Sequence, residues 1–568
     1  MAIASVTATV ARPLRQRADA DAWIMRGALV AIGLYLIVTV VLPLYSLLAK
    51  SFENRDGDFI GLGNYVAYFA NPALFSALIH SIVIGLTTTA ITVPLAFIYA
   101  YAVTRSRMPG RALFRGIALL PLLAPSLLPA LSLLYLFGNQ GMLKGLLLGH
   151  SVYGPIGIVI GEVFFTFPQA LMILLTALAN TDQRLYDAAI SLRAAPSRIF
   201  RTVTLSSCRY GLISAGFVTF TLAFTDFGVP KVIGGDYNVL ATDVYQQVVG
   251  QFNFQMGAVV GMILLAPAVL SFVADRMMQR RQVALVSARA VPFTPAPDLR
   301  RDVLCLAICG LVAVFILGMI GMAAFGSIIT YWPYDLTITF KNYDFGAIAT
   351  NGWEPYRNSL VLASATAVFG TAIIFSGAYL VEKSRGFRRV RGFVQFLCLL
   401  PLAVPGLVIG LAYIFFFNEP SNPLHFLYLT MAILVINTIA HFYTVCHLTA
   451  VTALKQLDPE FEAVSASLGV PAYKTLWRVA IPICLPAIVD IGIYLFVNAM
   501  TTVSAVVFLY SADTKLASIA VLNMDDAGKT SSAAAMGMTI VASCILLRLL
   551  QVLLMRGLSR RSEVWRQR

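Results

Sequence analysis

Charged side chains are scarce in this chain of 568 residues. Asp, Glu, Lys and Arg make up 12% of the sequence, whereas 59% of the residues are hydrophobic and the mean hydropathy is +0.80. A soluble domain usually carries about 25% charged residues. The composition therefore excludes an ordinary soluble globular protein and indicates an integral membrane protein.

Sequence patterns for catalysis and metal binding are also missing. The five histidines are dispersed, and no zinc motif, nucleophile elbow or paired-carboxylate site stands out. The seven cysteines lie in or near apolar runs without the spacing of a metal site, so we interpret them as packing residues. We predict that the chain is not an enzyme and has no catalytic or metal-binding residue.

Long apolar runs dominate what is present. A helix of about 20 residues crosses a hydrocarbon core about 30 Å thick, and the sequence contains twelve runs near this length. We therefore predict an all-α membrane protein with about twelve transmembrane helices. The predicted spans are residues 27–48, 79–103, 112–137, 152–178, 211–231, 256–275, 303–326, 359–381, 393–417, 426–450, 483–509 and 533–555.

The net charge of +14 is explained by topology. Lys and Arg gather before the first span, after the last, and in alternate loops between spans. The opposite loops are mixed to acidic, as at Asp525 and Asp526. Because basic loops remain in the cytoplasm, we predict that both termini are cytoplasmic and that the basic residues do not bind nucleic acid.

The chain contains one pattern twice. LLPLLAPSLLPALSLLYLFG at residues 119–138 recurs as LLPLAVPGLVIGLAYIFFFN at 399–418, and residues 181–212 match 457–488. Each copy has six spans, so both halves enter the membrane the same way round, and we expect a pseudo-two-fold axis along the membrane normal. The predicted parts are an N-terminal arm (1–26), a first membrane domain (27–275), an extended linker (276–302), a second membrane domain (303–556) and a basic tail (557–568).

A polar, amphipathic segment follows the fourth span of each half. In the second half, Asp458 is placed to cap a short helix that presents Phe461, Val464 and Leu468 on one face and ends at Gly469. In the first half, Asp182 takes the cap position, and we expect Leu185, Ala188 and Leu192 on the inner face. An amphipathic helix lying on the inner leaflet is the alternative. The occurrence of the segment at two symmetric places in the chain instead favours docking to a partner that has two-fold symmetry.

These segments resemble the EAA loop of binding-protein-dependent ABC importer permeases. The pattern is E-A-A, three residues, Gly, nine residues, and I-x-L-P. Asp187, Ala188 and Ala189 fit E-A-A in the first half, but Arg193 and Ser206 replace its Gly and Pro. The second half keeps Gly469 and Pro482, although Ala463 stands at the Glu position, beside Glu462. The resemblance implies that both loops couple to an ATPase subunit and that the two docking sites are unequal.

The resemblance covers nearly the whole chain as two fused permease domains. It implies a permease in a bacterial inner membrane, with two copies of a cytoplasmic ATPase and an extracytoplasmic solute-binding protein as partners. ATP and Mg would be bound by the ATPase, and no cofactor by this chain. Residues 224–250 and 501–528 look most like 2-aminoethylphosphonate permeases, with ferric iron permeases next. A secondary transporter and a channel or scaffold are the alternatives from other classes.

Polar side chains inside spans are the candidates for the solute pathway, since they are costly in a bilayer. Asp226 and Lys231 stand out, and together they suit a zwitterionic solute. The alternative is that these two residues pair with each other and close the outer end. The predicted pathway also includes neutral hydrogen-bonding groups at the matching place in the second half, which are Asn498, Thr501 and Thr502. Two further carboxylates, Glu162 and Asp490, are secondary candidates.

Overall fold

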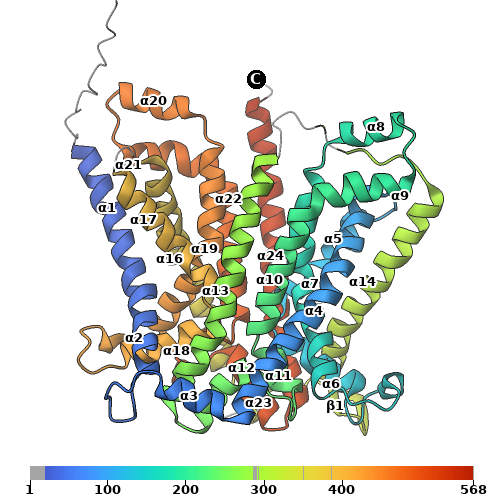
Figure 1. Ribbon diagram of the computed structural model, residues 1–568, viewed down its shortest axis with the longest axis vertical. Coiled ribbons are helices and arrows are strands. Elements are labelled where there is room, and N and C mark those ends of the chain that lie inside the picture. The colour runs from blue at the N-terminus through green and yellow to red at the C-terminus, as the bar shows by residue number, and fades with distance from the viewer. Residues whose placement is uncertain (1–19, 286–290, 292, 349–350, 385–386, 567–568) are drawn as a thin grey trace, which may run out of the picture.

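The protein is a bundle of long, roughly parallel helices (Figure 1). The computed structural model describes residues 20–285, 291, 293–348, 351–384 and 387–566. Within this part of the chain, nine helices are long and apolar enough to cross a membrane, and up to eleven if each of two bent pairs is one span. The all-α membrane architecture is thereby confirmed, whereas the number twelve stays a prediction.

The first half contains thirteen α-helices. They are α1 (Ala20–Leu36), α2 (Leu42–Ser51), α3 (Gly63–Ala70), α4 (Pro72–Arg105), α5 (Arg111–Ala118), α6 (Leu127–Phe137), α7 (Pro155–Ala179), α8 (Gln183–Ser191), α9 (Pro196–Ile199), α10 (Ser206–Thr225), α11 (Gly228–Ile233), α12 (Leu240–Tyr245) and α13 (Phe254–Leu285). A π-helical turn joins α1 to α2, so these two form one span.

The described part of the second half follows a similar order, with a short β-hairpin added, with one continuous first helix and without a counterpart of α11. Its elements are α14 (Leu299–Ser327), β1 (Ile329–Tyr331), β2 (Asp335–Ile338), α15 (Phe345–Ile348), α16 (Glu354–Lys383), α17 (Arg388–Leu399), α18 (Gly406–Phe417), α19 (Met431–Lys455), α20 (Pro459–Ser467), α21 (Ala472–Thr475), α22 (Ile481–Thr501), α23 (Ala517–Asp526) and α24 (Thr530–Arg566). The two strands pair antiparallel.

Two predicted spans are sharply bent. We expected continuous helices over residues 112–137 and 393–417, but the chain turns by 103° before α6 and by 112° before α18. At each bend a 3-10 turn that contains Pro121 or Pro401 precedes a second proline, Pro125 or Pro405. Since proline lacks the amide hydrogen that a helix needs, the paired prolines end the first helix of each pair.

Two further predicted spans end early. Residues 211–231 and 483–509 were expected to be continuous, but α10 ends at Thr225 and α22 ends at Thr501. The next residues, Asp226 and Thr502, have an extended backbone, with ψ of 139° and 137°. The breaks therefore fall at matching positions of the two copies.

The bends and the breaks touch one another in each half. A Cβ on Gly228, after the break, would overlap Ser126, before α6, with 2.9 Å to the Ser126 Cβ. In the second half the residue types are exchanged: Gly406 stands at the bend, and a Cβ there would overlap Ser504. Each contact thus combines one serine with one glycine, because two side chains do not fit.

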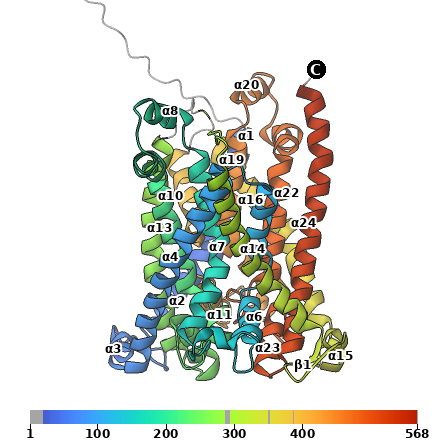
Figure 2. The same cartoon turned by 90° about the vertical axis from the view of Figure 1, so that its right-hand side faces the viewer.

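The first helix of each half packs against the other half. The α1 helix contacts α16 and α17, whereas α14 contacts α4, α5 and α6. Figure 2 shows α14 lying along the helices of the first half. The two halves are therefore interlocked through their first helices and not merely apposed.

The linker is shorter than predicted. The α13 helix continues to Leu285 and α14 begins at Leu299, so residues 276–285 and 299–302 are helical where we expected extended chain. The predicted N-terminal arm lies mostly outside the described residues, which begin at Ala20. The predicted tail is helical as far as Arg566.

Candidate functional site

Two short helices, α8 and α20, project from the same end of the bundle on opposite flanks (Figure 1). The α3 and α23 helices and the β-hairpin lie at the other end (Figure 1). The two amphipathic segments therefore lie at one end of the bundle, where the C-terminal end of α24 also projects (Figure 1).

The α8 helix begins at a side-chain cap and is held from below by one aromatic residue. Asp182 Oδ1 accepts the amide hydrogen of Arg184 at 3.0 Å. Tyr186 is buried, and its hydroxyl lies 3.0 Å from Thr204 Oγ1. The predicted E-A-A residues are on or near the surface: Asp187 and Ala188 are exposed, and Ala189 is half-buried.

The α20 helix has a similar cap and a similar end. Asp458 Oδ1 accepts from the amide of Glu460 at 2.9 Å. Ala463 is exposed, whereas the side chain of Glu462 lies outside the described part of the structure. After the helix, Gly469 has a φ of +64°. The left-handed conformation at this position is the usual way to end a helix.

Arg193 adopts the conformation that the glycine adopts in the other copy. Its φ is +54°, against +64° at Gly469, so both helices end in the left-handed region. A side chain there is strained by about 1 kcal/mol. Beyond the two ends, Ser206 and Pro482 occupy matching positions in the first turns of α10 and α22, each after a π-helical turn.

The apolar faces of both helices point outward. We predicted that Leu185, Ala188 and Leu192 face inward, but all three are exposed, Leu192 to 82%. In α20, Phe461, Val464 and Leu468 are likewise exposed, Leu468 to 72%. The spacing of apolar residues correctly predicted a face but not its direction. Exposed apolar patches of this kind mark interaction sites.

The predicted pair of Asp226 and Lys231 does not form. Asp226 Oδ2 accepts from the amide of Val229 at 2.9 Å, and Asp226 lies beside the fully buried Glu162 of α7. Lys231 Nζ instead lies 3.0 Å from Asp526 Oδ1 on α23, in the other half. The break after α10 falls between the two residues, so that Asp226 lies in the extended segment and Lys231 in α11.

The neutral candidates of the second half bond locally. Asn498 Nδ2 donates to Tyr494 O at 2.8 Å, and Thr501 Oγ1 donates to Val497 O at 3.0 Å. Ser518 Oγ donates to Thr502 O at 2.7 Å. Among the described residues, no hydrogen bond joins these groups to Asp226 or Lys231, so the structure does not assemble the predicted pathway residues into one cluster.

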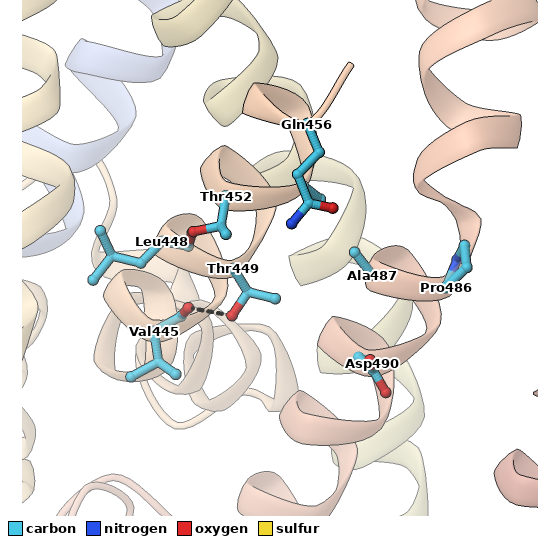
Figure 3. Close-up of a pocket in the computed structure, with 9 residues that line it drawn as sticks. Val445, Leu448, Thr449, Thr452, Gln456, Pro486, Ala487 and Asp490 are labelled. Atoms are coloured by element: carbon cyan, nitrogen blue, oxygen red, sulfur yellow. Dashed lines mark hydrogen bonds between the residues drawn. The ribbon is translucent and has the colours of Figure 1, made fainter. Parts of the chain in front are cut away.

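A pocket of about 570 Å³ lies between α19 and α22 (Figure 3). Thr449 of α19 and Gln456, directly after α19, line one side, and Asp490 of α22 lines the other (Figure 3). Gln551 of α24 donates a hydrogen bond to the Asp490 carboxylate. The pocket thus brings an exposed carboxylate, two threonines and an amide together within a lining that is otherwise apolar.

The matching positions in the first half carry the same kind of contact with the residues exchanged. The repeat pairs Asp490 with Ser214 and Gln551 with Asp275. Ser214 of α10 donates to the Asp275 carboxylate of α13, and both residues are buried. Of these two carboxylates only Asp490 is exposed. The sequence marked Asp490 as secondary because a single residue in a span does not reveal its neighbours.

Comparisons with known proteins support one assignment. Residues 374–560 match the family described as "Binding-protein-dependent transport system inner membrane component". The chain is 28% identical, over 548 residues, to the ferric transport system permease protein FbpB of Actinobacillus pleuropneumoniae, which covers 91% of this chain and 76% of the relative. It is also 28% identical, over 519 residues, to the putative ferric transport system permease protein FbpB 1 of Haemophilus influenzae (86% and 78%).

Among solved structures, one similar chain comes from a bacterial alginate ABC transporter in complex with an alginate pentasaccharide-bound periplasmic protein. It shares 14% identity at a TM-score of 0.39, over 46% of this chain and 95% of that chain.

The similarity to full-length permeases extends across both halves of the chain, and the family match falls in the second half. The candidate spans place the chain in the inner membrane as a multi-pass protein. The second half therefore carries a binding-protein-dependent transport system inner membrane component domain, and the similarity along both halves supports a fused, double-domain ABC importer permease.

Proposed function

We propose that this permease imports ferric iron. The observation that carries the proposal is the similarity to ferric transport permeases over 91% of the chain. A zwitterionic solute was favoured by the closeness of Asp226 and Lys231 in the sequence. In the structure Lys231 pairs with Asp526 instead, so the two residues do not form a joint site for such a solute. The resemblance of residues 224–250 and 501–528 to 2-aminoethylphosphonate permeases keeps that solute as the second candidate.

Energy for the transport would come from two copies of an ABC ATPase that dock on α8 and α20. The exposed apolar residues of the two helices supply the contact surfaces, and this end would face the cytoplasm together with both termini. ATP and Mg would be held by the ATPase. When ATP draws the two subunits together, α8 and α20 approach each other and the bundle opens at the α3–α23 end, where a solute-binding protein delivers its cargo.

The pathway itself would hold iron weakly. Among the described residues, no group of three or more His, Cys, Asp or Glu side chains is arranged to bind a metal ion. A tight site would also slow release, so selectivity would rest with the binding protein. The exposed carboxylate of Asp490 and the threonines beside it offer oxygen atoms to a hydrated cation on its way to the cytoplasm.

Uptake in whole cells tests the proposal. Cells with and without this chain, both keeping the partner ATPase and binding protein, would be given radiolabelled ferric iron or radiolabelled 2-aminoethylphosphonate. We expect chain-dependent uptake of iron only. Uptake of the phosphonate alone would transfer the function to the second candidate.

The energy source separates the permease from a secondary transporter. A catalytically dead ATPase subunit is expected to abolish uptake, whereas a proton uncoupler at constant ATP is not. Uptake that survives the dead ATPase and stops with the uncoupler would contradict the proposed coupling.

A further inference from the structure

The linker between the two halves is bonded to the start of α8. The amide of Gln183 donates to Val291 O at 3.0 Å, and the amide of Val291 donates to Asp182 Oδ1 at 3.2 Å. The amide of Thr294 donates to Gln183 Oε1 at 3.2 Å. Asp182 is also the cap of α8. The linker thus attaches to the residues that set where α8 begins.

Phe293 closes a stack beneath α8. Its ring centroid lies 4.7 Å from that of Tyr186, the buried residue of α8. The guanidinium carbon of Arg105 lies 4.1 Å from the Phe293 centroid, within cation–π range. Arg105 is 3% exposed, and its Nη2 donates to Leu178 O at 2.8 Å. Phe293 therefore connects α8 with the ends of α4 and α7.

The far end of the linker is fastened to the same region. Arg107 Nε donates to Pro295 O at 2.7 Å, and the Arg107 amide donates to Asp302 Oδ1 at 3.0 Å. Asp302 lies in the first turn of α14, which packs along α4, α5 and α6. A short chain of contacts therefore runs from α8 through the linker to α14.

The second loop is held from outside at a different place. Two hydrogen bonds from other parts of the chain reach Ala472 of α21, after α20 has ended. Asp21 Oδ2 accepts from the Ala472 amide at 2.9 Å, and the Tyr379 hydroxyl donates to Ala472 O at 3.3 Å. Ser465 of α20 lies 2.5 Å from Thr475, oxygen to oxygen, within its own loop. The α8 helix is thus joined at its start to the linker, a segment that the chain contains once.

We propose that residues 291 and 293–296 clamp α8 and make the two ATPase docking sites inequivalent, with Phe293 as the positioning residue. The inference rests on the proposed docking role of α8 and α20. A displacement that the ATPase imposes on α8 is passed through the linker to α14, and hence to the interlocked half. A displacement of α20 passes through α21 into α22. The fused linker is therefore part of the coupling machinery and not a passive tether.

The first test uses the full chain assembled with its ATPase subunits in lipid nanodiscs or proteoliposomes. Phe293→Ala is compared with Phe293→Tyr, which keeps the ring, and with Phe340→Ala, an exposed aromatic at the opposite end. The readout is ferric iron transported per ATP hydrolysed, a ratio that does not depend on the amount of folded protein. We expect Phe293→Ala to lower the ratio at least about fivefold, and the other two variants to match the wild type. An unchanged ratio in Phe293→Ala overturns the clamp.

The second test asks whether the clamp stays closed. Cysteines placed at Gln183 and Val291 are expected to form a disulfide, because the backbones of these residues are hydrogen-bonded, and the native cysteines are buried. We expect the oxidised protein to transport as well as the reduced one. Loss of transport on oxidation, with recovery on reduction, would show that the linker must leave α8 and would overturn the proposal.

The two hypotheses fail in different ways. If the wild-type chain does not stimulate or bind an ABC ATPase, the proposed function fails whatever the disulfide does. If the wild type couples normally but no disulfide forms between positions 183 and 291, the clamp alone fails.

Discussion

At the residue scale, the contact between bend and break shows how the two copies solve one packing problem differently. Ser126 faces Gly228 in the first half, and Gly406 faces Ser504 in the second. The close approach leaves room for one side chain only, so either partner serves as the small one. Small residues at such crossings let backbones pack closely in membranes. An alignment of the two copies does not reveal this contact, because it shows only two unrelated differences, Ser126 against Gly406 and Gly228 against Ser504.

A compensating double substitution tests this contact. Gly228→Ser alone is expected to destabilise the folded protein by about 1–3 kcal/mol through overpacking. Ser126→Gly in the same chain should recover most of the loss, since it recreates the arrangement of the second half. Melting temperatures in detergent measure both variants, and Gly216→Ser, where an added Cβ makes ordinary contacts only, is the control. A double variant no more stable than Gly228→Ser would refute the exchange.

Asp243 of α12 provides a prediction about pH. It is 4% exposed, and burial raises the pKa of its carboxyl to about 7, from 3.8. The folded protein therefore keeps a proton that the unfolded chain loses, and stability falls as the pH rises from about 4 to about 7. Asp243→Asn removes this loss, because asparagine does not titrate. We expect the melting temperature of the variant, relative to that of the wild type, to be higher at pH 8 than at pH 5.

The exposed Asp513, at the same end of the bundle, supplies the control as Asp513→Asn. If the melting temperatures of Asp243→Asn and the wild type differ by the same amount at pH 5 and at pH 8, the carboxyl does not hold its proton in the folded state.

At the scale of elements, the sequence predicted where the spans lie but not where they break. Pro94, Pro168, Pro267 and Pro486 all lie inside unbroken helices. Proline by itself is therefore no sign of a break here, because neighbouring helices can satisfy the carbonyl groups that it leaves free. The bends coincide with two prolines four residues apart, Pro121 with Pro125 and Pro401 with Pro405. That pairing was visible in the sequence as part of the repeat.

The positions and lengths of α8 and α20 were predicted from the sequence, but the direction in which their apolar faces point was not. An apolar stripe in a membrane protein can face the bundle, the lipid or a partner, and its spacing is the same in each case. Tyr186, which holds α8 from below, was overlooked because it lies outside the stripe at Leu185, Ala188 and Leu192. A tyrosine with one buried hydrogen bond is common enough that its role shows only once Thr204 is seen beside it.

The ends of α8 and α20 allow a matched pair of substitutions. No heavy atom lies within 4 Å of a Cβ built on Gly469, so the cost of Gly469→Asp is limited to about 1 kcal/mol of backbone strain, and we expect the fold and membrane insertion to be kept. It is nevertheless expected to abolish iron uptake, because the new side chain projects into the ATPase contact. Arg193→Gly is expected to preserve uptake and to stabilise the end of α8 by about 1 kcal/mol.

Uptake assays and the amount of protein in purified membranes measure both effects. Normal uptake by Gly469→Asp would remove α20 from the docking surface. An equal loss in Arg193→Gly would contradict the predicted inequality of the two loops.

At the scale of the whole molecule, the α3–α23 end carries contacts between the halves. Lys231 of α11 pairs with Asp526 of α23, and Tyr245 of α12 stacks with Phe508 at 6.2 Å. In the proposed cycle this end must open when the binding protein delivers its cargo. The ion pair therefore favours the closed arrangement by about 1 kcal/mol, since it is partly exposed.

Removing the ion pair is expected to loosen the resting state. Lys231→Asp should raise ATP hydrolysis in the absence of the binding protein about fivefold, the ratio that corresponds to about 1 kcal/mol. Lys231→Asp combined with Asp526→Lys should return hydrolysis to the wild-type rate. Lys529→Gln is the control, because Lys529 Nζ donates to Ile348 O within one half. A double swap that stays at the raised rate would show that the pair does not hold the halves together.

The exchange of first helices has a consequence for biogenesis. The ribosome delivers α1 to the membrane before α16 and α17, against which α1 packs. The contact face of α1 must therefore wait in lipid, or on an insertion factor, until most of the second half has been synthesised. The first half is likewise left incomplete until α14 arrives. A truncated product from premature termination would expose both unfilled surfaces to quality-control proteases, so this polypeptide is matured as a unit rather than one half after the other.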